Sequence, residues 1–128
     1  MITRLKTSKE SKRRLEELNR VLKMSSNAVI LRYAISKSIL CDKDINSDID
    51  AEVDNNSGFE ITRQTLFGEN EIVYKLLMGI KFSDNDSVFF PTLTNKHIER
   101  GLKILEREYK FAGNKTKFII NTINKMDI

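Results

Sequence analysis

The sequence lacks several residue types on which common protein functions depend. Its 128 residues hold one cysteine, one histidine and one proline, and no tryptophan. A single cysteine excludes an internal disulfide, and no run of 18 apolar residues is present to span a membrane. Residues 1–6 contain no apolar stretch of the kind found in secretion signals. We therefore expect a cytoplasmic protein whose thiol stays reduced.

Motifs that bind nucleotides or metals are also missing. The chain has neither a GxxxxGK[S/T] phosphate loop nor a GxGxxG turn. The alternating carboxylates of residues 48–54 resemble a calcium loop, but Val53 and Phe59 stand where such a loop needs glycine and glutamate. Nucleases cluster carboxylates around a divalent metal, and no spacing fixes such a cluster for the three glutamates available, Glu60, Glu69 and Glu71. We predict no metal site and no cofactor, and we favour a protein that is not an enzyme.

The single cysteine and the single histidine each allow two interpretations. Cys41 could carry sulfur as a persulfide, or it could be an inert packed thiol at the end of an apolar helix. His97 lies near the start of a predicted helix, where the helix dipole disfavours its charged form. It could act as a general base, although packing or a hydrogen bond is the interpretation that we favour.

Positive charge is concentrated in the N-terminal third of the chain. Residues 1–43 hold 11 Lys/Arg and 4 Asp/Glu, a net charge of +7. Residues 44–71 hold 1 and 8, a net charge of −7, and residues 72–128 hold 10 and 6, a net charge of +4. This separation predicts a surface that faces a polyanion, and the alternative is a set of solvated helix faces.

Nucleic-acid contact is the function that the basic third favours. Six of its cations are dense enough to neutralise several phosphates: Arg4, Lys6, Lys9, Lys12, Arg13 and Lys23. Aromatic residues are few near them, so base stacking is not the expected mode of contact. We expect contacts to the nucleic-acid backbone, with little reading of base sequence.

The spacing of apolar residues predicts a mainly α fold, a compact bundle of about five helices in one domain, residues 1–128. An extended segment at residues 2–7 precedes a helix that begins near Ser8, where Thr7 and Glu10 form a capping-box pattern. The second helix, residues 27–40, is apolar almost all round, which predicts the centre of the core or an oligomer interface. Arg32 within it needs a carboxylate or carbonyl partner.

The middle of the chain predicts loops and one amphipathic helix. Residues 42–57 are polar and acidic, and we expect a mobile surface loop. Residues near 59–66 form either a small strand or an irregular turn. A helix at residues 69–80 follows, with one apolar face made of Ile72, Val73, Leu76, Leu77 and Ile80.

The last third predicts two more helices. A loop at residues 81–93 holds a partly buried pair, Phe89 and Phe90, and Thr94 caps a helix at residues 95–111. Gly101 inside that helix costs roughly 1 kcal/mol in helix propensity, which indicates close packing against another helix. A final helix at residues 115–125 carries Phe118, Ile119, Thr122, Ile123 and, just beyond, Met126.

Read in order, several blocks resemble the DNA sulfur modification protein DndE family. They are the helix opening at Thr7–Ser8 with Leu15 and Leu18, then NAVILRYAISKS at 27–38, GFEITRQTLFGE at 58–69 and HIERGLKIL at 97–105. The resemblance spans about residues 5–105. This chain departs from the family pattern in an acidic insert at residues 42–56 and in a lysine-rich end after Gly113.

The resemblance implies a small helical subunit of the bacterial and archaeal system that installs phosphorothioate linkages in DNA. Members of the family associate as tetramers and bind duplex DNA, with nicked duplex favoured. They act beside a cysteine desulfurase, an iron–sulfur sulfurtransferase-like protein and an ATPase. The resemblance implies that the basic residues of the first helix are candidates for DNA contact. It also implies a structural role for the residues of the central block that match the family pattern: Gly58, Arg63, Gly68 and Glu69.

Two alternatives to a DNA-binding subunit of that complex remain open at this point. The first forty residues also resemble a ribbon-helix-helix repressor, in which strands of two chains pair and Arg4 and Lys6 would face bases. The other alternative is a DNA-nicking or sulfur-transferring enzyme of the same system.

Overall fold

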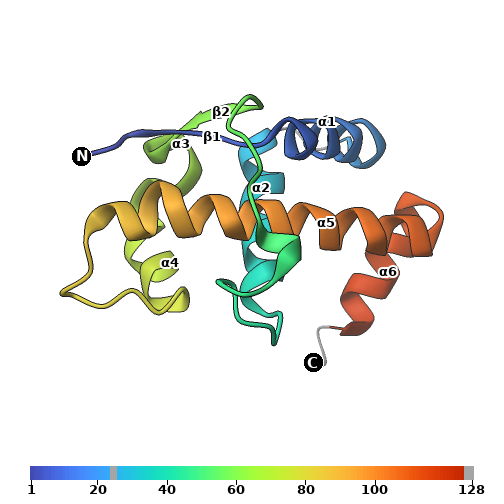
Figure 1. The fold of residues 1–128 in the computed structure, drawn as a ribbon. Coiled ribbons are helices and arrows are strands. Elements are labelled where there is room, and N and C mark those ends of the chain that lie inside the picture. Colours follow the sequence, from blue (N-terminus) through green and yellow to red (C-terminus); the bar gives the residue numbers. More distant parts are fainter. Residues whose placement is uncertain (24–25, 126–128) are drawn as a thin grey trace.

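Two helices that cross at the centre organise the structure, a computed structural model that describes residues 1–23 and 26–125. Helix α2 (Asn27–Ile39) and helix α5 (Thr94–Ala112) pack across each other (Figure 1). Gly101 permits this approach, because a Cβ atom there would lie 1.9 Å from the carbonyl oxygen of Ala34. The close packing predicted for Gly101 is therefore confirmed.

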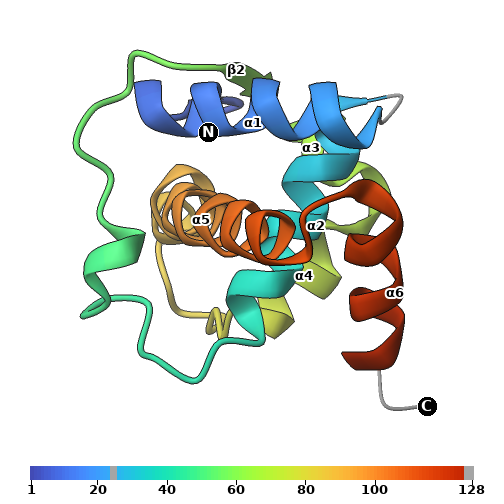
Figure 2. The same ribbon diagram turned by 90° about the vertical axis from the view of Figure 1, so that its right-hand side faces the viewer.

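Shorter elements surround this crossing. Helix α1 lies along one side of α5, and α6 packs near the C-terminal end of α5 (Figure 2). The remaining bounds are β1 (Arg4–Lys6), α1 (Lys9–Leu22), the 3-10 helix η1 (Ile49–Ala51), β2 (Glu60–Thr62), α3 (Arg63–Phe67), the 3-10 turn η2 (Gly68–Asn70), α4 (Glu71–Leu77), the irregular helical segment η3 (Val88–Leu93) and α6 (Lys115–Lys125). The predicted mainly helical fold with a small strand is confirmed.

The N-terminal segment forms one strand of a small antiparallel sheet. Strand β1 pairs with β2 so that Arg4 lies opposite Thr62 and Leu5 opposite Ile61. Leu5 is buried while its neighbours Arg4 and Lys6 are exposed, as alternation in a half-covered strand requires. The helix α1 then begins after Ser8, whose hydroxyl accepts a hydrogen bond from the Ser11 N–H at 3.0 Å. The predicted start is confirmed, although Ser8 caps the helix rather than Thr7.

Helix α2 forms the centre of the core, as its apolar surface predicts. Ile30, Leu31, Ala34 and Ile35 are all buried within the chain. Arg32 finds the carbonyl partners that it needs, because its guanidinium donates to the backbone oxygens of Thr65 and Leu66 at 3.3 and 3.1 Å. Of the two alternatives for this helix, the structure favours the protomer core.

Helix α4 shows the opposite outcome. It has the predicted apolar face, but its side chains point to solvent: Ile72 is 70% exposed and Leu76 72% exposed, and Val73 and Leu77 are exposed as well. The predicted helix is also shorter, because η2 precedes it and the helix ends at Leu77. Amphipathic spacing indicates that a face is apolar, and tertiary packing decides whether anything in the same chain covers it.

The segment before α5 is more ordered than the predicted loop. Phe89 and Phe90 are fully buried, not partly, and they pack with Phe67 at ring-centroid distances of 5.2 and 6.3 Å. Because η3 continues directly into α5, Thr94 does not cap the helix, and its hydroxyl donates to the Phe89 carbonyl at 2.8 Å. Of the residues named for the last helix, Phe118 is buried in α6, and Met126 lies outside the described residues.

Candidate nucleic-acid interface

The six predicted contact residues lie along β1 and α1. Arg4 and Lys6 stand on the exposed side of β1, which leads straight into α1, and Lys9, Lys12 and Arg13 lie on the first turns of that helix. Lys23 is the C-cap of α1 and has a left-handed backbone conformation. It lies about 20 Å along the helix axis from Lys9, at 1.5 Å per helical residue. In the structure, the predicted contact residues thus follow β1 and α1 from one end of the helix to the other.

Four of these cations carry unopposed charge. Among the described residues, no carboxylate pairs with Lys6, Lys9, Lys12 or Lys23, and all four side chains are exposed. We call these four residues the lysine edge. Unpaired ammonium groups in water keep their charge available to a phosphate, so the lysine edge is the part of the predicted site that can bind a polyanion without first breaking an ion pair.

The two arginines of the predicted set are partly neutralised. Arg4 pairs with Glu60 at 3.2 Å, and Arg13 pairs with Glu10 at 3.0 Å and with Glu106 at 3.4 Å. These pairs are solvent-exposed on the arginine side, and such pairs contribute about 0–1 kcal/mol. They reduce the net charge near each guanidinium without blocking it.

A buried carboxylate holds α1 against α5. Glu99 of α5 accepts hydrogen bonds from the hydroxyls of Ser8 and Ser11 at 2.5 and 3.1 Å. Arg14 and Lys103 lie within 3.6 Å of its other oxygen. A buried glutamate needs such partners, so this cluster sets the position of α1 and of the cations on its outer side. Apart from its position beside the apolar stripe of α5, no sequence pattern indicated a role for Glu99.

A second buried cluster is built around Arg63. Its guanidinium pairs with Glu71 and with both oxygens of Asp86, at 2.8 and 2.7 Å, and it lies 5.3 Å from the Phe90 ring centre. Hydrogen bonds from Arg63 are the main cause that lowers the pKa of both carboxyls. Arg63 thereby ties α3 to α4 and to the loop before η3, a structural role as the resemblance implied.

A third cluster contains the only histidine. His97 is 4% exposed, and its Nδ1 lies 2.7 Å from the Ser38 hydroxyl. Burial, and then the nearby Arg100 charge, lower the pKa of His97 to about 4. The imidazole is neutral near pH 7. The packing that the sequence favoured for it is present, but its hydrogen bond is to a side chain of α2 and is not a helix cap.

Arg100 joins that histidine cluster to the acidic segment, residues 42–56. Its guanidinium donates to the Ser38 hydroxyl at 2.8 Å, to the Lys43 carbonyl at 2.9 Å and to Asp48 at 3.2 Å. Asp48 and Ala51 are both buried. The expected mobile surface loop is therefore anchored on α5, because a buried aspartate and a buried arginine compensate each other's charge.

The acidic segment also contacts cations on the outer side of α5. Asp50 pairs with Arg107 at 2.7 Å, and its backbone carbonyl accepts from Lys103 at 3.1 Å. Asn46 accepts from Lys96 at 3.2 Å. We call Lys96, Lys103 and Arg107 the α5 cations. Lys103 and Arg107 pair with carboxylates of the chain, in contrast to the lysine edge, whereas Lys96 contacts only the neutral amide oxygen of Asn46.

The residues considered for chemistry do not converge. Cys41 is half-buried just after α2 and Glu60 is committed to Arg4, while Glu71 is committed to Arg63. Within residues 1–23 and 26–125, no three His, Cys, Asp or Glu side chains are grouped so that they could hold a metal ion. The same residues include no helix with the length and apolar character needed to cross a membrane.

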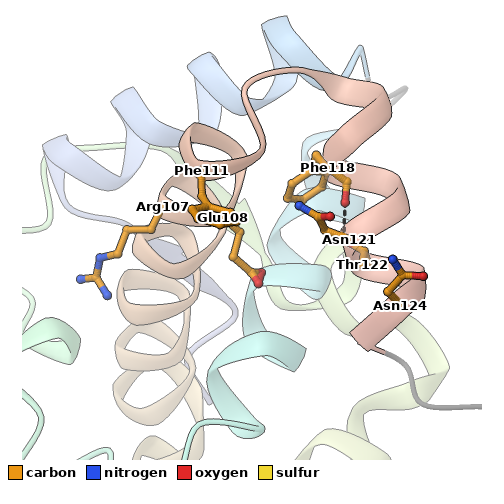
Figure 3. A pocket seen from close by; sticks show the side chains of 7 residues that line it. All are labelled: Arg107, Glu108, Phe111, Phe118, Asn121, Thr122 and Asn124. Atoms are coloured by element: carbon orange, nitrogen blue, oxygen red, sulfur yellow. Dashed lines mark hydrogen bonds between the residues drawn. The ribbon is translucent and has the colours of Figure 1, made fainter.

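A hollow of about 360 Å³ lies between the end of α5 and α6 (Figure 3). Its two charged lining residues are engaged elsewhere: Arg107 binds Asp50, and Glu108 accepts from Lys37. What remains are phenyl rings and neutral polar side chains from Phe111, Phe118, Asn121, Thr122 and Asn124. This lining offers surface for packing, and none of its neutral side chains is an acid or base.

The pairing of β1 bears on the repressor alternative. A ribbon-helix-helix dimer pairs the N-terminal strands of two chains. Here β1 is paired with β2 of its own chain, through a register that also buries Leu5 against the core. This pairing uses one edge of the strand and counts against that alternative.

These features define a small helical protein with one basic edge and three buried polar clusters that hold the fold together. The family model of the DNA sulphur modification protein DndE matches residues 4–113, so the chain belongs to that family. Comparison with individual curated proteins finds no match. The protein is thus one of the DNA sulphur modification system, whose membership implies DNA and the other proteins of that system as partners.

Proposed function

We propose that this protein is the DNA-binding subunit of the DNA phosphorothioate modification complex and that it performs no chemistry of its own. It contacts the backbone of duplex or nicked DNA through the lysine edge, with Arg4 and Arg13 beside it. The observation that carries the proposal is the unopposed charge of the lysine edge in a family whose substrate is DNA.

The expected mode of binding is electrostatic and indifferent to base sequence. Each phosphate that a lysine neutralises releases counterions, which adds about 0.9 to the slope of log affinity against log salt. Four contacts from the lysine edge would give a slope of about 3 to 4 per protomer. Competition by unrelated duplex DNA should be as effective as competition by the labelled sequence, because the contacts are to phosphates.

The test is fluorescence anisotropy with intact and nicked duplexes of one length across a salt series. We expect binding to both, with affinity that falls linearly on the log–log plot. A matched control is the pair of substitutions Lys43→Gln and Lys81→Gln, in the loops after α2 and α4, which lie across α5 from α1 (Figure 1). Binding that ignores salt, or that the control weakens as much as changes in the lysine edge do, would reject the proposal.

The exposed face of α4 supports self-association. Ile72, Val73, Leu76 and Leu77 form an apolar surface, and the highly exposed Phe82 follows shortly after. Contiguous apolar patches of this kind are commonly protein–protein contacts. We propose that copies of the chain associate through this face as a tetramer, the state that the family resemblance implies, which repeats the lysine edge by symmetry.

Light scattering tests the assembly directly. The parent protein should exceed the monomer mass of 14.8 kDa at micromolar concentration, and Leu76→Glu should shift it toward that mass. The matched control is Leu40→Glu, because Leu40 is 78% exposed and lies outside α4. A parent protein that is monomeric, or a control that dissociates equally, would contradict this proposal.

A further inference from the structure

Positive charge also gathers toward the far end of the chain. Residues 109–124 contain three lysines, Lys110, Lys115 and Lys117, and no aspartate or glutamate. Lys115 and Lys117 are exposed and make no ion pair among the described residues. Lys110 is also exposed, with Glu106 at 3.8 Å. Lys115 and Lys117 lie beyond residues 4–113, which match the family model.

The fold brings these lysines to the C-terminal end of α1. Lys115 and Leu22 line the same hollow, and Lys110 lines another together with Leu18, Val21 and the carboxylates Glu17 and Glu106. Figure 2 shows the start of α6 beside the end of α1. Lys23, the C-cap of α1, lies at this end too. Lys23 of the lysine edge and Lys115 of α6 therefore lie at the same end of α1, although they are about 90 residues apart in sequence.

The separation of the two ends of α1 matches a single duplex. The helix has 14 residues, which is about 20 Å at 1.5 Å per residue. Successive phosphates of one DNA strand advance about 3.4 Å along the axis, so 20 Å corresponds to about six base-pair steps. A duplex lying along α1 would reach cations at both ends of the helix.

We propose that Lys115 and Lys117 form a second phosphate-binding site on the same duplex that the lysine edge contacts. The ligand is the sugar–phosphate backbone, since two exposed ammonium groups that form no ion pair within residues 1–23 and 26–125 offer charge and no pattern for reading bases. This site rests on the proposed DNA-binding function and extends it to a helix outside the family-model match. It makes the C-terminal helix part of the DNA footprint.

The test compares Lys115→Gln/Lys117→Gln with the parent protein in the anisotropy assay. Loss of two phosphate contacts should weaken binding on the order of tenfold near 0.1 M salt and reduce the log–log slope by about 1.8. The control Lys43→Gln/Lys81→Gln removes the same charge and should change neither value appreciably. Both α6 lysines are exposed, so the unfolding midpoint should stay that of the parent.

The outcomes separate the two proposals. If the parent protein does not bind DNA, the proposed function fails. If the parent binds and Lys9→Gln/Lys12→Gln weakens it, while the α6 variant keeps the parent's affinity and slope, only the second site is overturned. If the control lowers the slope as much as the α6 variant does, the effect is one of net charge and the site is likewise overturned.

Discussion

The lysine edge and the α5 cations are built from the same residue types and differ in what faces them. On α5, Arg107 forms an ion pair with Asp50, and Lys103 donates a hydrogen bond to the Asp50 backbone carbonyl. On β1 and α1, none of the four lysines Lys6, Lys9, Lys12 and Lys23 forms an ion pair with a described carboxylate. A count of basic residues treats both groups alike. What distinguishes a binding surface from a solvated or internally paired one is the location of the nearest carboxylate.

The largest expected effect comes from releasing the acidic segment. Asp48→Ala removes the carboxylate partner of buried Arg100 and leaves its charge uncompensated. We expect a loss of about 3–5 kcal/mol in the free energy of unfolding, measured by urea denaturation. Asp54→Ala, an exposed position in the same segment, should change stability by less than about 0.5 kcal/mol. Equal stabilities for the two variants would mean that the segment is not anchored as described.

Acid should weaken the same region through His97. Its pKa falls from 6.5 in the unfolded chain to about 4 when folded, so the unfolded state binds the proton first. Stability is complete above pH 6.5 and declines as the pH falls toward 4, by about 3 kcal/mol at 1.36 kcal/mol per pH unit. The pKa of Asp48 is lowered from 3.8 by the Asp50 N–H and by Arg100, so its contribution is lost only below that window.

The measurement is simple because the chain has one histidine. An NMR titration follows a single imidazole. Urea denaturation at pH 7, 5.5 and 4 gives the slope of the unfolding free energy against pH. His97→Gln should lose the slope between pH 6.5 and 4, whatever its starting stability. An imidazole that titrates near 6.5 in the folded protein would disprove the assignment.

The direct contrast of the two cation groups should have a moderate effect. Lys9→Gln/Lys12→Gln should weaken DNA binding on the order of tenfold near 0.1 M salt and lower the salt slope by about 1.8. Lys103→Gln/Arg107→Gln removes the same charge from α5 and should leave affinity within about twofold, because both cations already pair with carboxylates. Anisotropy checks both, and equal losses would erase the distinction between the two surfaces.

The smallest effect sharpens the comparison. Asp50→Asn removes the exposed ion pair with Arg107 and should cost less than about 1 kcal/mol in stability. It should raise DNA affinity by about two- to threefold if freeing an α5 cation adds attraction for phosphates. The isosteric change keeps the backbone carbonyl that accepts from Lys103. An unchanged affinity would show that α5 is too far from the bound duplex to contribute.

Local sequence patterns predicted most helices and strands. Helix α2 and the start of α1 follow from apolar spacing and a serine cap, which are interactions within one or two turns. Gly101 was predicted to permit close packing, and it does so against Ala34. The irregular entry into α5 was missed, since Thr94 is a good cap residue by composition, whereas in the structure η3, which has non-helical dihedral angles at Phe90, runs into the helix.

The six cations of the candidate site lie along β1 and α1 in the structure, and their binding of DNA stays a prediction. The sequence could not indicate that Arg4 and Arg13 are paired whereas the lysines are not. The partners of Arg13 include Glu106, 93 residues away. Glu99 was missed because its role in positioning α1 exists only once Ser8 and Ser11 are brought against it.

By itself, the sequence determined the family, the mainly helical fold, the unequal distribution of charge and the start of α1. These depend on residue identity and on contacts a few residues apart, which spacing records directly. The tertiary structure alone decided which charges stay unopposed, that the acidic segment is anchored on α5, and that the apolar face of α4 is exposed. Those outcomes depend on carboxylates and helices that meet only after the chain has crossed itself, so that Lys23 and Lys115 share one end of the molecule while Asp50 reaches Arg107.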